Sequence, residues 1–186
     1  MAYFPIFISL EDKNVLIVGA GKVAERKVEK LLPFNPNITV VAKDIKSSSI
    51  KKLAKEKKIN LINRGFLFTD LDNKELVIVA VDNIDLQREI YNYCFRRKIP
   101  VNSVDNPKYC TFLFPAYVKE KEIVIGISTS GYAPALAKKL KEKIKQCLPE
   151  NLEEVFEKLK NIRKNKDKGE ERQNLIYKVL SELHTD

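Results

Sequence analysis

One segment, residues 14–24, constrains the fold of this chain more than any other. The short apolar run NVLIV leads directly into the hexapeptide GAGKVA, which fits the pattern G-x-G-x-x-G/A. Residues 22–32 then place apolar side chains at helical spacing, and Pro33 ends that pattern. A buried strand, a glycine loop and a helix in this order are typical of the first unit of a parallel α/β sheet.

Each small residue of the loop has its own physical purpose. Gly19 permits the tight turn, Gly21 lets a phosphate approach the backbone, and Ala24 lets the helix pack closely on the strand. The N-terminus of the next helix presents free N–H groups and a partial positive charge. The loop therefore predicts an adenine dinucleotide as cofactor, whereas the alternative is a glycine turn that only packs.

Strand-like and helix-like segments alternate as far as residue 105. The run LVIVAV at 76–81 is the most hydrophobic and is predicted to be central, and residues 84–97 offer Ile84, Ile90, Tyr91, Cys94 and Phe95 for one helix face. This rhythm predicts a doubly wound parallel sheet. The further strands are expected at 38–42, 59–62 and 100–104, and a helix is expected at 45–58.

The rhythm changes after residue 105. Residues 112–118 and 122–128 resemble a hairpin, Pro134 suits the first position of a helix that continues to 147, and two more helical patterns cover 153–164 and 170–183. We therefore expect three parts: an NAD-binding Rossmann-like domain at 1–111, a central strand–helix region at 112–148, and a small helical domain at 149–186.

The end of the second strand bears on the choice of cofactor. An acid at this place binds the ribose 2′-OH of NAD, and Asp44 lies one position later than is ideal. Lys43 would attract the 2′-phosphate of NADP instead. The sequence favours NAD and leaves NADP open.

Two polar clusters are candidates for substrate chemistry. Asn102-Ser103-Val104-Asp105 ends the fifth predicted strand, so Asp105 is either a general acid or base or a residue that supports a turn before Asn106-Pro107. Ser128, Thr129 and Ser130 precede Gly131 and a helix, so they form an anion cradle or simply cap that helix.

Net charge bears on the kind of partner that the chain binds. The net charge is +9, from 34 Lys and Arg against 25 Asp and Glu, and the excess lies in residues 1–150. It predicts an anionic partner. The dense lysine run at 51–58 lacks aromatic residues, so a solvated helix face is favoured over a nucleic-acid surface.

Metal, nucleophile and membrane sites also find no support in the sequence. Three scattered cysteines and one histidine, His184, give neither a metal site nor a protein nucleophile. Neither a spanning segment nor a secretory signal is visible, so we expect a cytoplasmic protein.

Five motifs in order carry a family resemblance. They are YFPIF at 3–7, VGAGKVAERK at 18–27, VNSVD at 101–105, FLFPA at 112–116 and ISTSGYAP at 127–134. Together they resemble the precorrin-2 dehydrogenase / sirohydrochlorin ferrochelatase family, the N-terminal module of siroheme synthases. The resemblance covers about residues 3–150. Ser130 departs from it, because the family usually has a second glycine there.

The resemblance implies NAD-dependent oxidation of precorrin-2 to sirohydrochlorin, and in some members insertion of ferrous iron. It implies Asp105 as the catalytic aspartate and Asn102 and Ser128–Ser130 at the substrate. The dinucleotide contacts fall on Gly19, Gly21, Lys22, Val23, Lys43, Asp44 and Asp82. It also implies a homodimer built through the central region. The alternatives are a dinucleotide-sensing Rossmann module without catalysis and, less favoured, a nucleic-acid binder.

Overall fold

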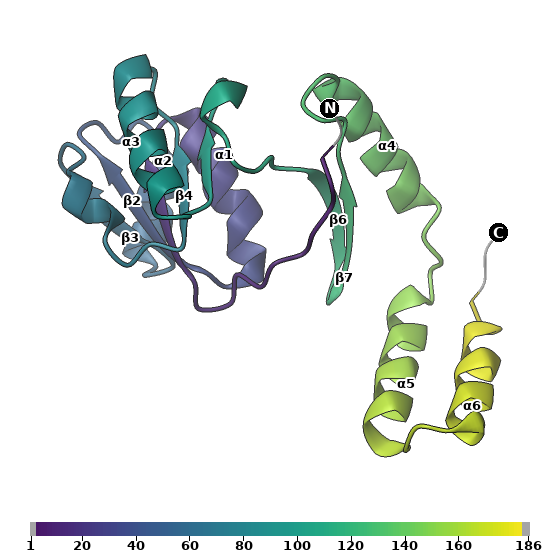
Figure 1. Cartoon of the computed structure of the whole chain (residues 1–186). Helices are drawn as coiled ribbons and strands as arrows, with labels where there is room; N and C mark the ends of the chain where they lie inside the picture. Colours follow the sequence, from purple (N-terminus) through teal and green to yellow (C-terminus); the bar gives the residue numbers. More distant parts are fainter. Residues whose placement is uncertain (1–2, 184–186) are drawn as a thin grey trace. The chain divides into compact units, whose positions relative to one another are not determined.

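The computed structural model describes residues 3–183. His184, one of the residues singled out in the sequence, lies outside this range. Residues Ile6–Leu113 form one compact unit, and the described residues from Phe114 onward form a second one together with the N-terminal segment up to Pro5. Figure 1 shows the elements along the chain.

The first unit is a five-stranded sheet in the order β3-β2-β1-β4-β5, and every neighbouring pair is parallel. Its strands are β1 (Asn14–Val18), β2 (Asn37–Ala42), β3 (Asn60–Asn63), β4 (Leu76–Val79) and β5 (Val101–Ser103). Its helices are α1 (Lys22–Leu31), α2 (Ser48–Lys55) and α3 (Ile84–Arg96). The predicted doubly wound Rossmann-like sheet is confirmed, and its strand order reverses between β1 and β4.

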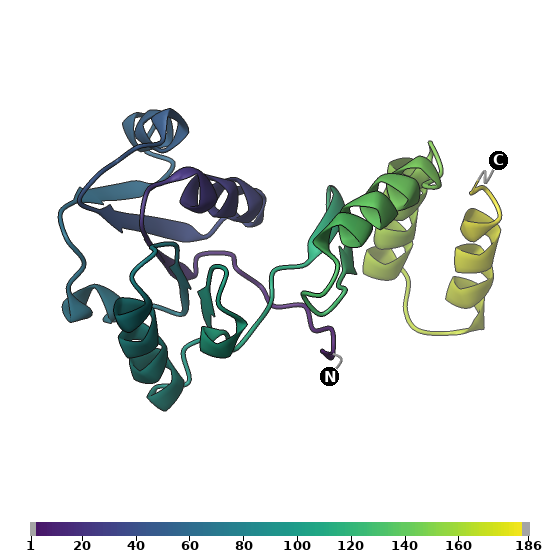
Figure 2. The same cartoon turned by 90° about the horizontal axis from the view of Figure 1, so that it is seen from above.

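Helices cover both faces of the sheet. Figure 2 shows α1 and α2 on one side of the strands and α3 on the other. Alternate residues of β1 serve the two faces: Leu16 and Val18 join the core cluster that also holds Ile90 and Cys94 of α3. Val15 and Ile17 point the opposite way and are also fully buried. Burial on both faces explains why β1 is apolar from Val15 to Val18.

Three details differ from the sequence predictions. The strand expected at 76–81 pairs on both sides, as expected of a central strand, but it ends at Val79. The helix expected at 45–58 is shorter, because the Ser47 hydroxyl caps it by accepting from the Ile50 N–H at 3.0 Å and Lys57 leaves the helical region at φ +56°. Ile84 and Phe95 do not join the buried face of α3 and are each 61% exposed, since a helix turns about 100° per residue and carries both far from Ile90.

The second unit holds a two-stranded antiparallel sheet and three helices. Its elements are β6 (Ala116–Glu120), β7 (Ile123–Ile127), α4 (Pro134–Gln146), α5 (Leu152–Asn165) and α6 (Glu170–Leu180). Lys160 and Lys121 pair with Glu122 and Glu153 and thereby tie α5 to the β6–β7 turn. Lys158 bridges Glu154 and Glu182, which joins α5 to the segment after α6. The predicted strand–helix region and C-terminal helices are confirmed as elements.

Candidate functional site

The glycine loop between β1 and α1 is held tightly against β4. Gly19 has φ +110°, and a Cβ on it would lie 2.2 Å from the carbonyl oxygen of Ala80. Its N–H donates to the carbonyl of Val41 at 2.8 Å, so the loop is also bonded to β2. The tight turn predicted at Gly19 is therefore confirmed, and the reason is contact with the neighbouring strand as well as the turn itself.

Gly21 stands in a different environment. It is the N-cap of α1, with extended backbone, and a Cβ on it would meet no atom within 4 Å. This open space lies beside the N–H groups of the first turn of α1, including those of Lys22 and Val23. A phosphate would fit here, because the backbone can be approached without any side chain in between.

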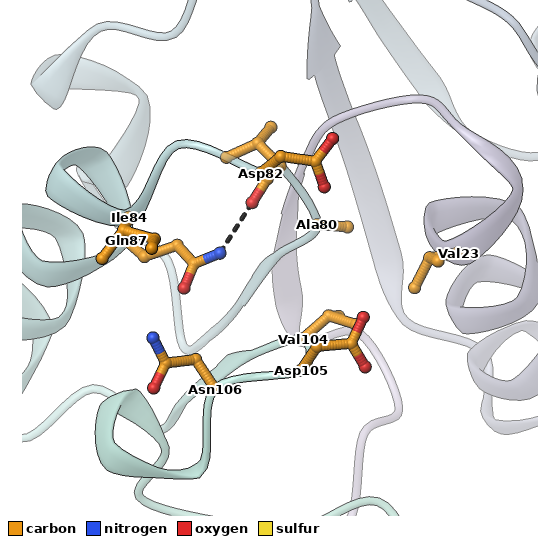
Figure 3. A pocket seen from close by; sticks show the side chains of 9 residues that line it. Val23, Ala80, Asp82, Ile84, Gln87, Val104, Asp105 and Asn106 are labelled. Carbon is orange, nitrogen blue, oxygen red and sulfur yellow. Dashed lines mark hydrogen bonds between the residues drawn. The ribbon is translucent and has the colours of Figure 1, made fainter.

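A pocket of about 240 Å³ opens beside this loop, where the strand order reverses. Val23 lines it from α1, while Asp82 and Asp105 come from the loops after β4 and β5. Figure 3 shows the two carboxylates on either side of the opening, with Val23 facing it. The remaining lining residues are Ala80, Val81, Ile84, Gln87, Val104 and Asn106. Three residues predicted from the sequence, Val23, Asp82 and Asp105, thus meet in one pocket.

Asp105 lies in a turn, as one of the two sequence interpretations requires, and it also borders the pocket. Its backbone lies in the left-handed region at φ +61°, the third position of a turn closed by the Asn106 N–H, which donates to the Ser103 carbonyl at 3.3 Å. Aspartate tolerates this conformation better than most residues. At the same time its exposed side chain lines the pocket. The same residue therefore forms the turn and directs its carboxylate to the pocket.

A half-buried lysine, Lys27, lies near enough to Asp105 for the two charges to interact. Lys27 is one helical turn after Val23 on α1, and burial lowers its pKa from the usual 10.5 to about 8, with a smaller contribution from the nearby charge of Lys30. Attraction to Cys110 and Asp105 opposes this fall. Lys27 thus supplies positive charge near the catalytic candidate. In the sequence it stands out only as the last residue of the VGAGKVAERK motif.

Asn102 is built into the structure rather than exposed. It is 6% exposed, and its amide donates to the carbonyl of Phe112 at 3.0 Å and to Sγ of Cys110 at 3.5 Å. Burial raises the pKa of the Cys110 thiol, which keeps it protonated and unreactive. These bonds fasten the chain after β5 and hold the Asp105 turn in place.

Lys43 and Asp44 come directly after β2 and are both exposed. The stem of Lys43 lies over Gly65, where a Cβ would come within 2.9 Å of Lys43 Cε. The amide of Asn63 donates to the Lys43 carbonyl at 2.7 Å. Both charges thus stand at the carboxyl edge of the sheet, on the β2 side of the glycine loop.

The hydroxyl cluster belongs to the second unit and lies between β7 and α4. Ser128 Oγ accepts from the Ser130 N–H at 3.1 Å, and Thr129 Oγ1 accepts from the Ala133 N–H at 3.3 Å. Ser130 itself is left-handed, at φ +53°. The N-cap of α4 is Ala133, so Ser130 itself does not cap the helix, whereas its neighbour Thr129 accepts from the N–H of the cap residue.

Among residues 3–183, no helix is long and apolar enough to cross a membrane. The same range contains no group of three or more His, Cys, Asp or Glu side chains that could hold a metal ion. The run of lysines at 51–58 is solvent-exposed, as expected for a solvated helix face.

Comparison with known proteins extends this picture. A family model described as "Putative NAD(P)-binding" matches residues 6–116. The siroheme synthase of Blochmanniella floridana is 43% identical over 142 residues, which cover 76% of this chain and 31% of the relative. That of Pseudoalteromonas atlantica is 42% identical over 142 residues, covering 76% and 30%. The chain thus spans about a third of the length of these relatives.

A solved structure covers nearly the whole chain. "SirC, precorrin-2 dehydrogenase" superposes with a TM-score of 0.77 at 20% identity, over 97% of this chain and 90% of that one. At this identity the match establishes the fold, including the central region and the C-terminal helices. The resemblance inferred from the five motifs is confirmed by the siroheme synthase relatives.

Proposed function

This chain belongs to the NAD(P)-binding family whose model matches residues 6–116, and on that premise we propose that it oxidises precorrin-2 to sirohydrochlorin with NAD⁺. The names of its relatives, siroheme synthases and a precorrin-2 dehydrogenase, support this reaction. The observation that carries the proposal is the pocket at the strand-order reversal, where Asp105 stands opposite the helix that begins at the glycine loop.

The residues present fit a dinucleotide. Gly21 leaves open space at the N-terminus of α1 for a pyrophosphate, and Lys43 and Asp44 stand where a ribose 2′-OH is bound. The pocket at the ends of β4 and β5 then receives the nicotinamide half. When bound, the cofactor accepts a hydride. Asp44 favours NAD over NADP, because a carboxylate repels a 2′-phosphate. The cation Arg64, which follows β3, is paired with Asp70 at 2.6 Å, so its charge is already balanced and is not offered to a 2′-phosphate.

Asp105 is the proposed proton acceptor. Oxidation of the macrocycle removes two electrons and one proton as a hydride, and a second proton leaves as the conjugation extends. An exposed carboxylate on a rigid turn can take that proton and pass it to solvent.

The substrate carries many carboxylates, so it needs hydroxyls, N–H groups and cations. The Ser128–Ser130 loop offers hydroxyls beside the N-terminus of α4, and we assign it to the substrate's carboxylates. We assign Asn102 an indirect role at the substrate, in which its buried amide holds the Asp105 turn in place. The excess of basic residues is consistent with such a substrate.

We also propose a homodimer. The N-terminal segment exposes large apolar side chains, among them Phe4 at 86% and Phe7 at 73%. Tyr132 before α4 and Leu136 and Leu140 on it are exposed as well. Exposed apolar surface of this extent commonly marks an interface. Sedimentation equilibrium should give twice the mass of 21.4 kDa, and a monomer at micromolar concentration would refute the dimer.

An anaerobic assay with precorrin-2 and NAD⁺ tests the reaction. We expect NADH to form with wild type and its rate to fall about 100-fold or more in Asp105→Asn, the loss typical of a missing general base. Dinucleotide binding without conversion would instead favour the sensing module. Ferrous iron is then added as a second substrate; we expect dehydrogenation only, and formation of siroheme would overturn that part.

A further inference from the structure

Gln87 is a buried polar residue on a helix face that is otherwise apolar. It is 5% exposed and lies one turn before Ile90, which is fully buried. Its amide nitrogen donates to the carbonyl of Val81 at 2.7 Å, the dashed bond in Figure 3. A carbonyl oxygen can only accept, so this bond fixes which end of the amide is nitrogen.

The other end of the same amide has no partner. Oε1 of Gln87 is one of two buried side-chain polar atoms in residues 3–183 that lack a hydrogen bond, the other being Oγ of Ser103. Gln87 lines the pocket, whereas Ser103 does not. A buried acceptor left unpaired costs about 1–3 kcal/mol, and a donor on a ligand in the pocket beside Gln87 would remove that cost.

The position of the pocket identifies the part of the ligand that reaches Gln87. Lys43 and Asp44 at the end of β2 mark the adenosine side, and the glycine loop after β1 takes the pyrophosphate. The pocket continues in the same direction, across the ends of β4 and β5. A dinucleotide laid across this edge places its nicotinamide ring there.

The chemistry of the lining agrees with this placement. Asp82 and Asp105 line the pocket with carboxylates, which accept hydrogen bonds and favour positive charge, and Gln87 adds an amide whose oxygen is an unpaired acceptor. The oxidised nicotinamide ring is cationic, and its carboxamide carries an N–H₂ donor. We propose that Gln87 Oε1 accepts a hydrogen bond from the nicotinamide carboxamide and thereby fixes the orientation of the ring; this rests on the proposed NAD-dependent function.

A cofactor analogue tests the inference on the wild-type protein. 3-Acetylpyridine adenine dinucleotide replaces the carboxamide N–H₂ with a methyl group and keeps the rest of the molecule. We expect it to bind about 10-fold more weakly than NAD⁺ by isothermal titration calorimetry, because the Gln87 oxygen stays unpaired. Equal affinities for the two dinucleotides would overturn the inference without any variant.

The variant Gln87→Met completes a thermodynamic cycle that compares two proteins, wild type and variant, with two dinucleotides, NAD⁺ and the analogue. It has a similar volume and no acceptor, so it should bind NAD⁺ about 10-fold more weakly and lose the preference for NAD⁺ over the analogue. ADP-ribose, which lacks the ring, should bind the variant and wild type alike, which checks that the fold is intact. If the variant weakens both dinucleotides equally, Gln87 meets another donor and the inference fails.

This measurement is independent of turnover. Should NAD⁺ bind with the expected preference while precorrin-2 is not oxidised, the proposed reaction fails and the role of Gln87 stands. Should precorrin-2 be oxidised while wild type binds NAD⁺ and the analogue equally, the reaction stands and the role of Gln87 fails.

Discussion

Replacing Gly19 with alanine should damage the fold itself. The new Cβ would lie 2.2 Å from the Ala80 carbonyl oxygen, and φ is +110°. The backbone conformation costs an L-residue about 1–3 kcal/mol. Relieving the contact requires the loop to move by roughly 1 Å. This movement strains two hydrogen bonds of 2.8 Å, from the Gly19 N–H to the Val41 carbonyl and from the Ala80 N–H to the Val18 carbonyl. Each of these bonds is worth about 1 kcal/mol.

The sum is about 3–5 kcal/mol, a large share of the 5–15 kcal/mol that stabilises a typical domain. At roughly 4–8 °C per kcal/mol, the melting temperature should fall by about 12 °C or more. Thermal unfolding followed by circular dichroism measures this. A melting temperature within a few degrees of wild type would refute the close approach of the loop to β4.

Gly21→Ala is the matched control for Gly19→Ala. Its Cβ meets nothing within 4 Å and its φ is −88°, so the melting temperature should change by no more than about 2 °C. NAD⁺ affinity should nevertheless fall about 10-fold or more, because the methyl group occupies the approach of the pyrophosphate. Unchanged NAD⁺ affinity in this variant would place the pyrophosphate elsewhere.

Three further variants test single features. Lys27 has its pKa lowered to about 8 in the folded state, so the unfolded state binds more protons between about pH 8 and 10.5 and stability should rise with pH across that window. In Lys27→Met this rise should vanish, and stability at pH 7 should increase by about 2 kcal/mol after allowing for solvent screening; urea titrations at several pH values measure both. Ser130→Gly should stabilise the second unit by about 0.5–1 kcal/mol, because Ser130 stands at φ +53°; a lower melting temperature would contradict this. Asn83 caps α3 by accepting from the Leu86 N–H at 3.0 Å, so Asn83→Ala should cost about 1 kcal/mol in urea unfolding, and no change would show that water replaces the cap.

Local signals were enough to predict the first unit. The strands at 14–18 and 38–42 are short β-branched runs buried on both faces, and the glycine loop after the first of them identified the turn and the helix beyond it. The helix over Pro134–Gln146 was predictable from proline at its first position. Boundaries failed where a single side chain decided them, as with the Ser47 cap of α2.

The site was only half predictable for a related reason. Val23, Asp82 and Asp105 each lie next to a recognisable strand or loop, so sheet topology brings them together. Gln87 gives no such signal, because its burial depends on the carbonyl of Val81 six residues earlier and on the pocket itself. The sequence shows only a polar residue on the apolar side of an amphipathic helix. Its burial becomes visible only when the helix is packed on the sheet.

Asp105 shows how the two kinds of information combine. From the sequence, a turn residue and a catalytic residue are rival interpretations, because each alone explains an aspartate at a strand end. In the structure the left-handed backbone at φ +61° and the pocket-lining carboxylate belong to the same residue. Most side chains would be strained there, so an aspartate that tolerates the turn while aiming a carboxylate at the pocket meets both demands. Asp105→Asn therefore tests the proposed proton acceptor alone, since asparagine keeps the turn and removes only the charge.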